Sequence, residues 1–160
     1  MNNLINTLAL TLAMTSPFSA ALASNPNDAI ISHIGNSSAT PNQSVFSDAT
    51  HQFEVHVSGK EISELAIKLP EGVSINSGIE VKTNSGEKVP AAVSVDEGKA
   101  RLIFSQAVAP GSTILVSMKG VKTPFYASNG YTWHYKVSAT KVGMKEEIPL
   151  GLAQVQIYPL

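Results

Sequence analysis

The sequence predicts an all-β protein: an antiparallel immunoglobulin-like β-sandwich of about eight or nine strands that follows a cleaved signal peptide. From residue 51 onward, apolar and polar residues alternate with a period of two, which is the pattern of half-buried strands. These segments recur about every 8 to 12 residues, with glycine, proline and asparagine at their joints, as is typical of sandwiches. No window of about a dozen residues carries the stripe of an amphipathic helix.

The N-terminal segment, residues 1–23, is predicted to be the signal peptide. It holds no charged side chain, and its apolar run is shorter than the about 20 residues that a membrane-spanning helix needs. Ala21-Leu22-Ala23 has the A-x-A form that signal peptidase cleaves, so Ser24 is the expected first residue of the mature protein. The segment lacks the Lys or Arg that usually starts such peptides, which leaves a retained N-terminal anchor as the alternative.

Residues 24–50 are rich in Asn, Ser, Thr, Ala and Pro and are expected to form a loosely structured N-terminal segment. Its one apolar group, Ile30, Ile31 and Ile34, is expected to pack against the domain as a short strand or turn. The β-sandwich domain is predicted over residues 51–160.

Each predicted strand has one apolar face. In chain order these faces are Phe53/Val55/Val57, Leu65/Ile67/Leu69, Val73/Ile75, Ile79/Val81, Val89/Ala91/Val93/Val95, residues 100–104, Ile114/Val116/Met118, residues 131–139 and residues 153–158. Turn sequences separate the earlier strands, and Asp96-Glu97-Gly98 is predicted to be the turn of a hairpin. The last two strands are expected to be joined by a looser connection through Gly143 and residues 149–151.

Composition excludes several classes of protein. The chain has 11 Lys and Arg against 12 Asp and Glu, a net charge of −1, so nucleic acid is not an expected partner. It has no cysteine, which removes disulfides and a lipid anchor at the cleavage site. No second apolar stretch of about 18 residues follows the signal peptide, so no membrane span is expected after cleavage. The predicted location is therefore the periplasm or the cell exterior.

An aromatic cluster is the most unusual local feature, with Phe125, Tyr126, Tyr131, Trp133 and Tyr135 within 11 residues. Side chains at alternate positions of a strand share a face, and a row of rings can stack on sugars or hold a partner. The alternative is an ordinary core strand with Trp133 at the centre of the sandwich. On the first interpretation, the candidate contact residues are Phe125, Tyr126 and Trp133, with the loop of residues 125–130 the better exposed part.

The four histidines, His33, His51, His56 and His134, suggest a second hypothesis, a copper site formed by His51, His56 and His134. Against it, His51 and His56 are five residues apart on one strand and so face opposite ways. No closely spaced histidine pair and no cysteine support the site, and scattered surface histidines are the alternative interpretation.

No catalytic motif is present in the sequence, and no cofactor is expected. The neighbouring carboxylates Asp96-Glu97 and Glu146-Glu147 are interpreted as solvated turns, because adjacent strand residues point apart. The prediction is therefore that the protein is not an enzyme. An active site assembled from distant strands is the alternative that a single sequence cannot reveal.

Several segments in a fixed order resemble a family of exported domains found mainly in cyanobacteria, the domain of unknown function family 2808. They are residues 51–59, 63–65, 69–73, 78–81, 104–111, 120–124 and 147–151, and the resemblance covers about residues 51–158. It implies an exported all-β domain and no catalytic residues. The function expected is that of a non-enzymatic exported β-sandwich that binds an envelope protein or an extracellular polysaccharide; the alternative is a periplasmic copper-binding protein. The oligomeric state is not predicted.

Overall fold

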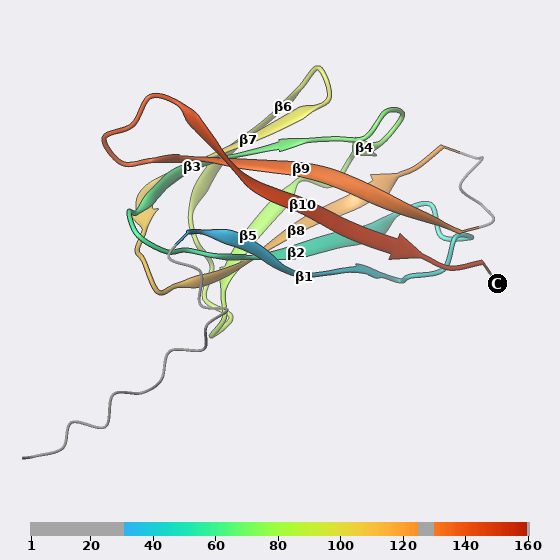
Figure 1. The fold of residues 1–160 in the computed structure, drawn as a ribbon. Coiled ribbons are helices and arrows are strands. Elements are labelled where there is room, and N and C mark those ends of the chain that lie inside the picture. Colours follow the sequence, from blue (N-terminus) through green and yellow to red (C-terminus); the bar gives the residue numbers. More distant parts are fainter. Residues whose placement is uncertain (1–30, 125–129, 160) are drawn as a thin grey trace, which may run out of the picture.

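Ten β-strands, paired into two antiparallel sheets, make up the computed structural model, which describes residues 31–124 and 130–159 (Figure 1). The strands are β1 (His33–Thr40), β2 (Ala49–His56), β3 (Ile62–Lys68), β4 (Ser74–Ile75), β5 (Ile79–Thr83), β6 (Ala91–Asp96), β7 (Lys99–Val108), β8 (Thr113–Lys122), β9 (Tyr131–Lys141) and β10 (Glu147–Ile157). The predicted signal peptide, and the candidates Phe125 and Tyr126, lie outside the described residues.

The two sheets have five strands each. The first sheet has the order β1-β2-β8-β4, with β5 also paired to β8, and the second has the order β10-β9-β3-β7-β6. Every strand pair is antiparallel. On one side of the sandwich, β10 of the second sheet also packs against β1 of the first (Figure 1). This arrangement confirms the predicted immunoglobulin-like sandwich, with ten strands in the described residues rather than eight or nine.

The core lies between the inner faces of the two sheets. The predicted alternation supplies it: Phe53 and Val55 from β2, Leu65 and Ile67 from β3, and Leu102 from β7 are all fully buried. Burial of such side chains is the main favourable contribution to folding, at about 1.5 to 3 kcal/mol each. In the described residues, no helix is long and apolar enough to cross a membrane.

Strand β1 lies inside residues 24–50, the segment expected to be loosely structured, so the structure differs from that expectation. The strand pairs along β2, from His33 opposite His56 to Thr40 opposite Thr50. The alternating pattern that predicts a strand is missing from its sequence for two reasons. Only a few of its side chains, Ala39 among them, face the core, and a register shift between Ile34 and Ser37 breaks the alternation.

Strand β10 is longer than predicted. It begins at Glu147, whereas residues 149–151 were expected to be a loose connection. The strand accommodates Pro149 because β10 lies at the edge of its sheet, where a missing N–H is tolerated, and a register shift between Pro149 and Gly151 absorbs the irregularity. This extension brings Glu147 onto the sheet.

The Asp96-Glu97-Gly98 hairpin is confirmed. Glu97 and Gly98 both have positive φ, 46° and 75°, and Asp96 pairs with Lys99 across the turn. Positive φ at both central positions is the geometry of the tight turn that matches the twist of two antiparallel strands. The turn places the carboxylates of Asp96 and Glu97 at one end of the β6–β7 hairpin.

Candidate functional site

The outer face of the second sheet carries ordered rows of side chains. Because β3 lies between β9 and β7, Lys68 is directly opposite Lys136 on one side and Lys99 on the other. The next outward-facing position of β3, Ala66, is opposite Ser138 and Arg101. A row of three lysines thus runs beside a row in which two small side chains leave space above the sheet.

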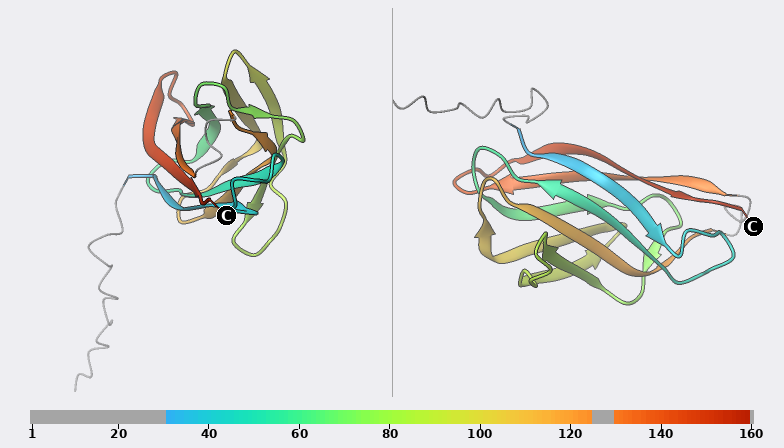
Figure 2. Two further views of the ribbon diagram at one scale, coloured as in Figure 1. Left: turned by 90° about the vertical axis from the view of Figure 1, so that its right-hand side faces the viewer. Right: turned by 90° about the horizontal axis from the view of Figure 1, so that it is seen from below.

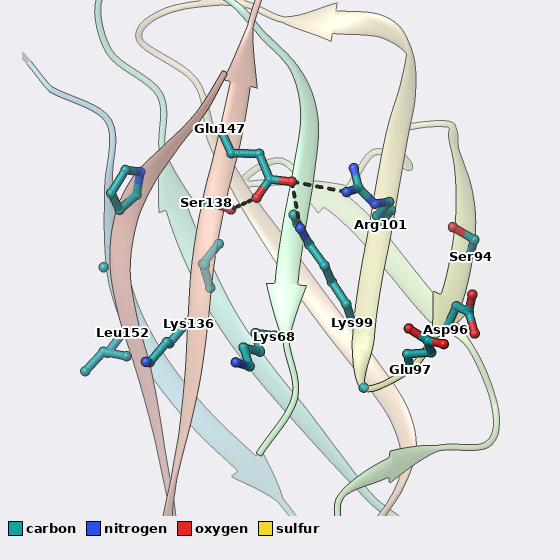
Figure 3. A pocket seen from close by; sticks show the side chains of 15 residues that line it. Lys68, Ser94, Asp96, Glu97, Lys99, Arg101, Lys136, Ser138, Glu147 and Leu152 are labelled. Atoms are coloured by element: carbon teal, nitrogen blue, oxygen red, sulfur yellow. Dashed lines mark hydrogen bonds and ion pairs between the residues drawn. The ribbon is translucent and has the colours of Figure 1, made fainter. Parts of the chain in front are cut away.

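A groove with a volume of about 1000 Å³ occupies this face (Figure 3). Its floor is formed by small residues, among them Ala66, Ser94, Ser138 and Gly151. Its lining includes residues of β10 and β6, the two edge strands of the sheet. Figure 2 shows these strands at opposite sides of the sandwich. The groove therefore crosses all five strands, and its lining comes from segments that are far apart in the sequence.

Glu147 reaches from β10 across the groove to β7 (Figure 3). Its Oε1 accepts a hydrogen bond from Lys99 Nζ at 2.7 Å and lies 3.3 Å from Arg101 Nη2. Its Oε2 accepts a hydrogen bond from the Ser138 hydroxyl at 2.9 Å. The hydrogen bond from Lys99, followed by that from Ser138 and the charges of Lys99 and Arg101, lowers the pKa of Glu147. Arg101 also donates to Glu64 Oε1 at 2.6 Å.

Lys68 and Lys136 form no hydrogen bond or ion pair with any described residue, and their side chains lie side by side in the groove (Figure 3). Both are exposed. At the other end of the groove, Asp96 and Glu97 are exposed on the β6–β7 turn. The groove therefore presents two uncompensated ammonium groups and, separately, two carboxylates.

The chemistry of this arrangement favours binding over catalysis. Ser138 donates to a carboxylate that two cations already hold, and a carboxylate with a lowered pKa is a weak general base. None of the described residues that line the groove is a histidine. Its charged and small side chains can instead hold an extended polar ligand by hydrogen bonds and ion pairs.

The aromatic row does not form a surface platform in the described residues. Trp133 and Tyr135 point into the sandwich because they occupy inward positions of β9, and only 2% of Trp133 is exposed. Trp133 is therefore a core residue, which corrects its selection as a contact candidate. Tyr131 shares that face, packs on the Trp133 ring with centroids 4.7 Å apart, and is half exposed at the start of the strand.

The predicted copper ligands are not brought together. His51 faces the core and His56 faces outward on the same strand, as expected, while His134 lies exposed on β9 in the other sheet. His56 instead stacks on His33, with ring centroids 4.9 Å apart, and its Nδ1 lies 3.0 Å from Thr113 Oγ1. Within the described ranges, no group of three or more His, Cys, Asp or Glu side chains could hold a metal ion.

His51 is a buried core residue that contacts the hydroxyl of a buried tyrosine. It is 1% exposed, and its Nδ1 lies 2.6 Å from the hydroxyl of Tyr135, which is also buried. Burial disfavours the charged form of each group, so it lowers the pKa of His51 to about 4 and raises the pKa of Tyr135. The pair links the inner faces of the two sheets by a hydrogen bond between neutral groups.

Sequence reasoning missed the groove. Each lysine of the row is one polar residue in an alternating strand and gives no signal alone. Both carboxylate pairs, Asp96-Glu97 and Glu146-Glu147, were interpreted as solvated turns. The structure confirms this for Asp96-Glu97, but Glu147 belongs to strand β10. The site could have been predicted only if the pairing of the strands had been known, because that pairing places its residues side by side.

Comparison with known proteins gives one family and a set of similar folds. The sequence model of a family described as "Protein of unknown function (DUF2808)" matches residues 34–157. No curated protein matches the chain.

Among solved structures, the major pilin subunit BcpA of Bacillus cereus is 11% identical, with a TM-score of 0.52, over 79% of this chain and 40% of that chain. The N-terminal domain of the Streptococcus gordonii adhesin Sgo0707 is also 11% identical, with a TM-score of 0.51, over 79% of this chain and 32% of that one. A collagen-binding domain from a Staphylococcus aureus adhesin is 8% identical over 80% of this chain and 97% of its own, with a TM-score of 0.48. The chain spans less than half the length of the first two, and the likeness to them shows the sandwich fold.

Proposed function

Since the chain belongs to the DUF2808 family, whose description assigns no activity, we propose from the structure that it is a non-enzymatic exported binding domain that holds an extracellular polysaccharide in the groove of the second sheet. The observation that carries the proposal is the groove itself, about 1000 Å³ in volume and floored by small side chains. Ligand-binding clefts of proteins fall in this range of size, about 300 to 1000 Å³.

Two features favour a polysaccharide over an envelope protein. Protein interfaces are enriched in aromatic side chains at an apolar centre, whereas the described residues that line this groove are charged, small or aliphatic. Asp96, Glu97 and the lysines can bond to sugar hydroxyls, and Leu152 and Pro149 offer small apolar contacts to the faces of the rings. The sandwich fold, shared with a domain of a streptococcal adhesin, is compatible with such a role.

Export is part of the proposal and rests on residues 1–23. An extracellular polymer can be reached only by a domain that has left the cytoplasm. Expression with the natural N-terminus, followed by mass measurement of the exported protein, is expected to give a chain that begins at Ser24. A chain that keeps residues 1–23 and stays with the membrane would contradict this part of the proposal.

The test of the proposed function is to fill the groove. Ser94→Trp places a large ring on the outer face of the edge strand β6, inside the groove. Ser38→Trp is the matched control, because Ser38 is exposed on β1, the edge strand of the other sheet. Binding to a panel of neutral and acidic extracellular polysaccharides is measured by affinity gel electrophoresis and calorimetry.

We expect the wild-type domain and Ser38→Trp to bind at least one polysaccharide of the panel with the same affinity, and Ser94→Trp to bind it about tenfold more weakly or not at all. Thermal unfolding of both variants checks that each is folded. Absence of binding to every polysaccharide, or equal binding by Ser94→Trp and the wild type, would overturn the proposal.

A further inference from the structure

We infer that Lys68 and Lys136 form an anion subsite of the groove and that its ligand is an acidic polysaccharide that carries carboxylates along its chain. This inference rests on the proposed function and names the class of polymer. The lysine row, Lys136-Lys68-Lys99, is its starting point, because the strand register sets the three side chains directly opposite one another.

The row places like charges at the distance of cross-strand neighbours, about 5 Å between Cβ atoms. Like charges directly opposite each other destabilise a sheet, so a counter-charge is needed. Glu147 supplies one for Lys99 and Arg101. Both of its oxygens are engaged, Oε1 by these two cations and Oε2 by Ser138, and within the described residues no ion pair joins it to Lys68 or Lys136.

Lys68 and Lys136 therefore keep adjacent ammonium groups without a carboxylate from the described residues (Figure 3). The nearest outward positions on the β3–β9 pair are Ala66 and Ser138, which leave room above the floor for a bound group. A carboxylate in this space can accept hydrogen bonds from both ammonium groups. Charge-assisted hydrogen bonds of this kind are about twice as strong as neutral ones.

The remaining charges of the groove select among anionic polymers. Asp96, Glu97 and Glu147 also line it, against Lys68, Lys99, Arg101 and Lys136, so three acids accompany four bases. Nucleic acid carries a dense row of phosphates and is bound by strongly basic surfaces, which this is not. A polymer of uronic acids has hydroxyls for Asp96 and Glu97 to accept hydrogen bonds from, and carboxylates for the lysine pair.

The experiment measures binding of the folded domain to polygalacturonate, with neutral dextran as the comparison polymer. The test variant is Lys68→Gln/Lys136→Gln. Its matched control is Lys60→Gln/Lys122→Gln, which removes the same charge from exposed lysines that do not line the groove. Glu147→Gln is a third variant, which releases Lys99 and Arg101 from their common carboxylate.

We expect the wild type to bind polygalacturonate more tightly than dextran, with an affinity that falls as salt rises. The Lys68/Lys136 variant should lose about tenfold or more of that affinity and most of the salt dependence, and the control should lose neither. Glu147→Gln should bind several-fold more tightly, because Lys99 becomes available to the polymer while Arg101 keeps its ion pair with Glu64; a structural role for Glu147 alone would not produce this gain.

Different results separate the inference from the proposed function. If Ser94→Trp abolishes binding while the Lys68/Lys136 variant binds as the wild type does, the groove holds a polymer but the anion subsite is wrong. If the lysine pair is required only for polyphosphate or for vesicles with anionic lipid, the assignment to carboxylate polysaccharides is wrong. If the wild type binds no polymer, both proposals fail.

Discussion

Mild acid should destabilise this domain through the buried His51. In the unfolded chain the imidazole takes up a proton near pH 6.5, but in the folded protein burial lowers its pKa to about 4. Between these values the unfolded state binds more protons than the folded state, so stability falls as the pH falls. From about pH 7.5 to about pH 5.5 the expected loss is about 1.4 kcal/mol, and by pH 4 it reaches about 3 kcal/mol.

The range above about pH 5.5 isolates this effect. Glu80 and Glu147 have pKa values lowered from 4.5, so their contributions to stability are lost only as the pH falls below that range. Urea unfolding, followed by the fluorescence of the single tryptophan, gives the unfolding free energy at both pH values. His51→Gln should remove the loss, and His134→Gln, at an exposed position of β9, should keep it.

If His51→Gln does not fold, an NMR titration of His51 in the wild-type domain tests the same prediction. The ring signals of His51 in the NMR spectrum of the wild type should show no protonation down to about pH 5. A midpoint near 6.5 for this ring, or the same pH dependence of stability in wild type and His51→Gln, would refute the argument that burial keeps the imidazole neutral.

Two further predictions concern the same core. Tyr135→Phe should destabilise the domain by about 1 to 3 kcal/mol in the same urea assay, because it leaves His51 Nδ1 buried without its partner at 2.6 Å. The control Tyr158→Phe removes an exposed hydroxyl and should change the free energy of unfolding by less than about 0.5 kcal/mol. Trp133, 2% exposed, should show blue-shifted emission that iodide quenches poorly; red-shifted emission that iodide quenches readily would place the ring on the surface and contradict the packing of β9.

The fold could be predicted from the sequence because its signals are local. Alternation, as in Phe53 and Val55, fixes which side chains face the core, and Asp96-Glu97-Gly98 supplies the positive φ values that its turn requires. The prediction was incomplete where an edge strand departs from alternation. β1 has few inward side chains, and β10 contains Pro149, so neither carries the full pattern of a central strand.

The candidate site could not be predicted, because it depends on strand order. Lys68, Lys99 and Lys136 are separated by 31 and 37 residues and meet only because β3 pairs with both β7 and β9. Periodicity shows that each lysine faces outward but not which residues lie beside it. The aromatic cluster had a local signal and attracted the functional hypothesis, yet its described members Trp133 and Tyr135 serve the core.

The lysine row is expected to have opposite effects on the stability of the fold and on ligand binding. If Lys68 and Lys136 are kept for a ligand, they act against the fold, since neighbouring like charges on a sheet are unfavourable by about 0.2 to 1 kcal/mol. Lys68→Gln should therefore leave the free energy of unfolding unchanged or raise it slightly at low salt, with the gain vanishing at high salt, while it weakens binding of the acidic polymer. A loss of more than about 1 kcal/mol would mean that the ammonium group stabilises the folded state, and the row would then be explained by structure rather than by a ligand.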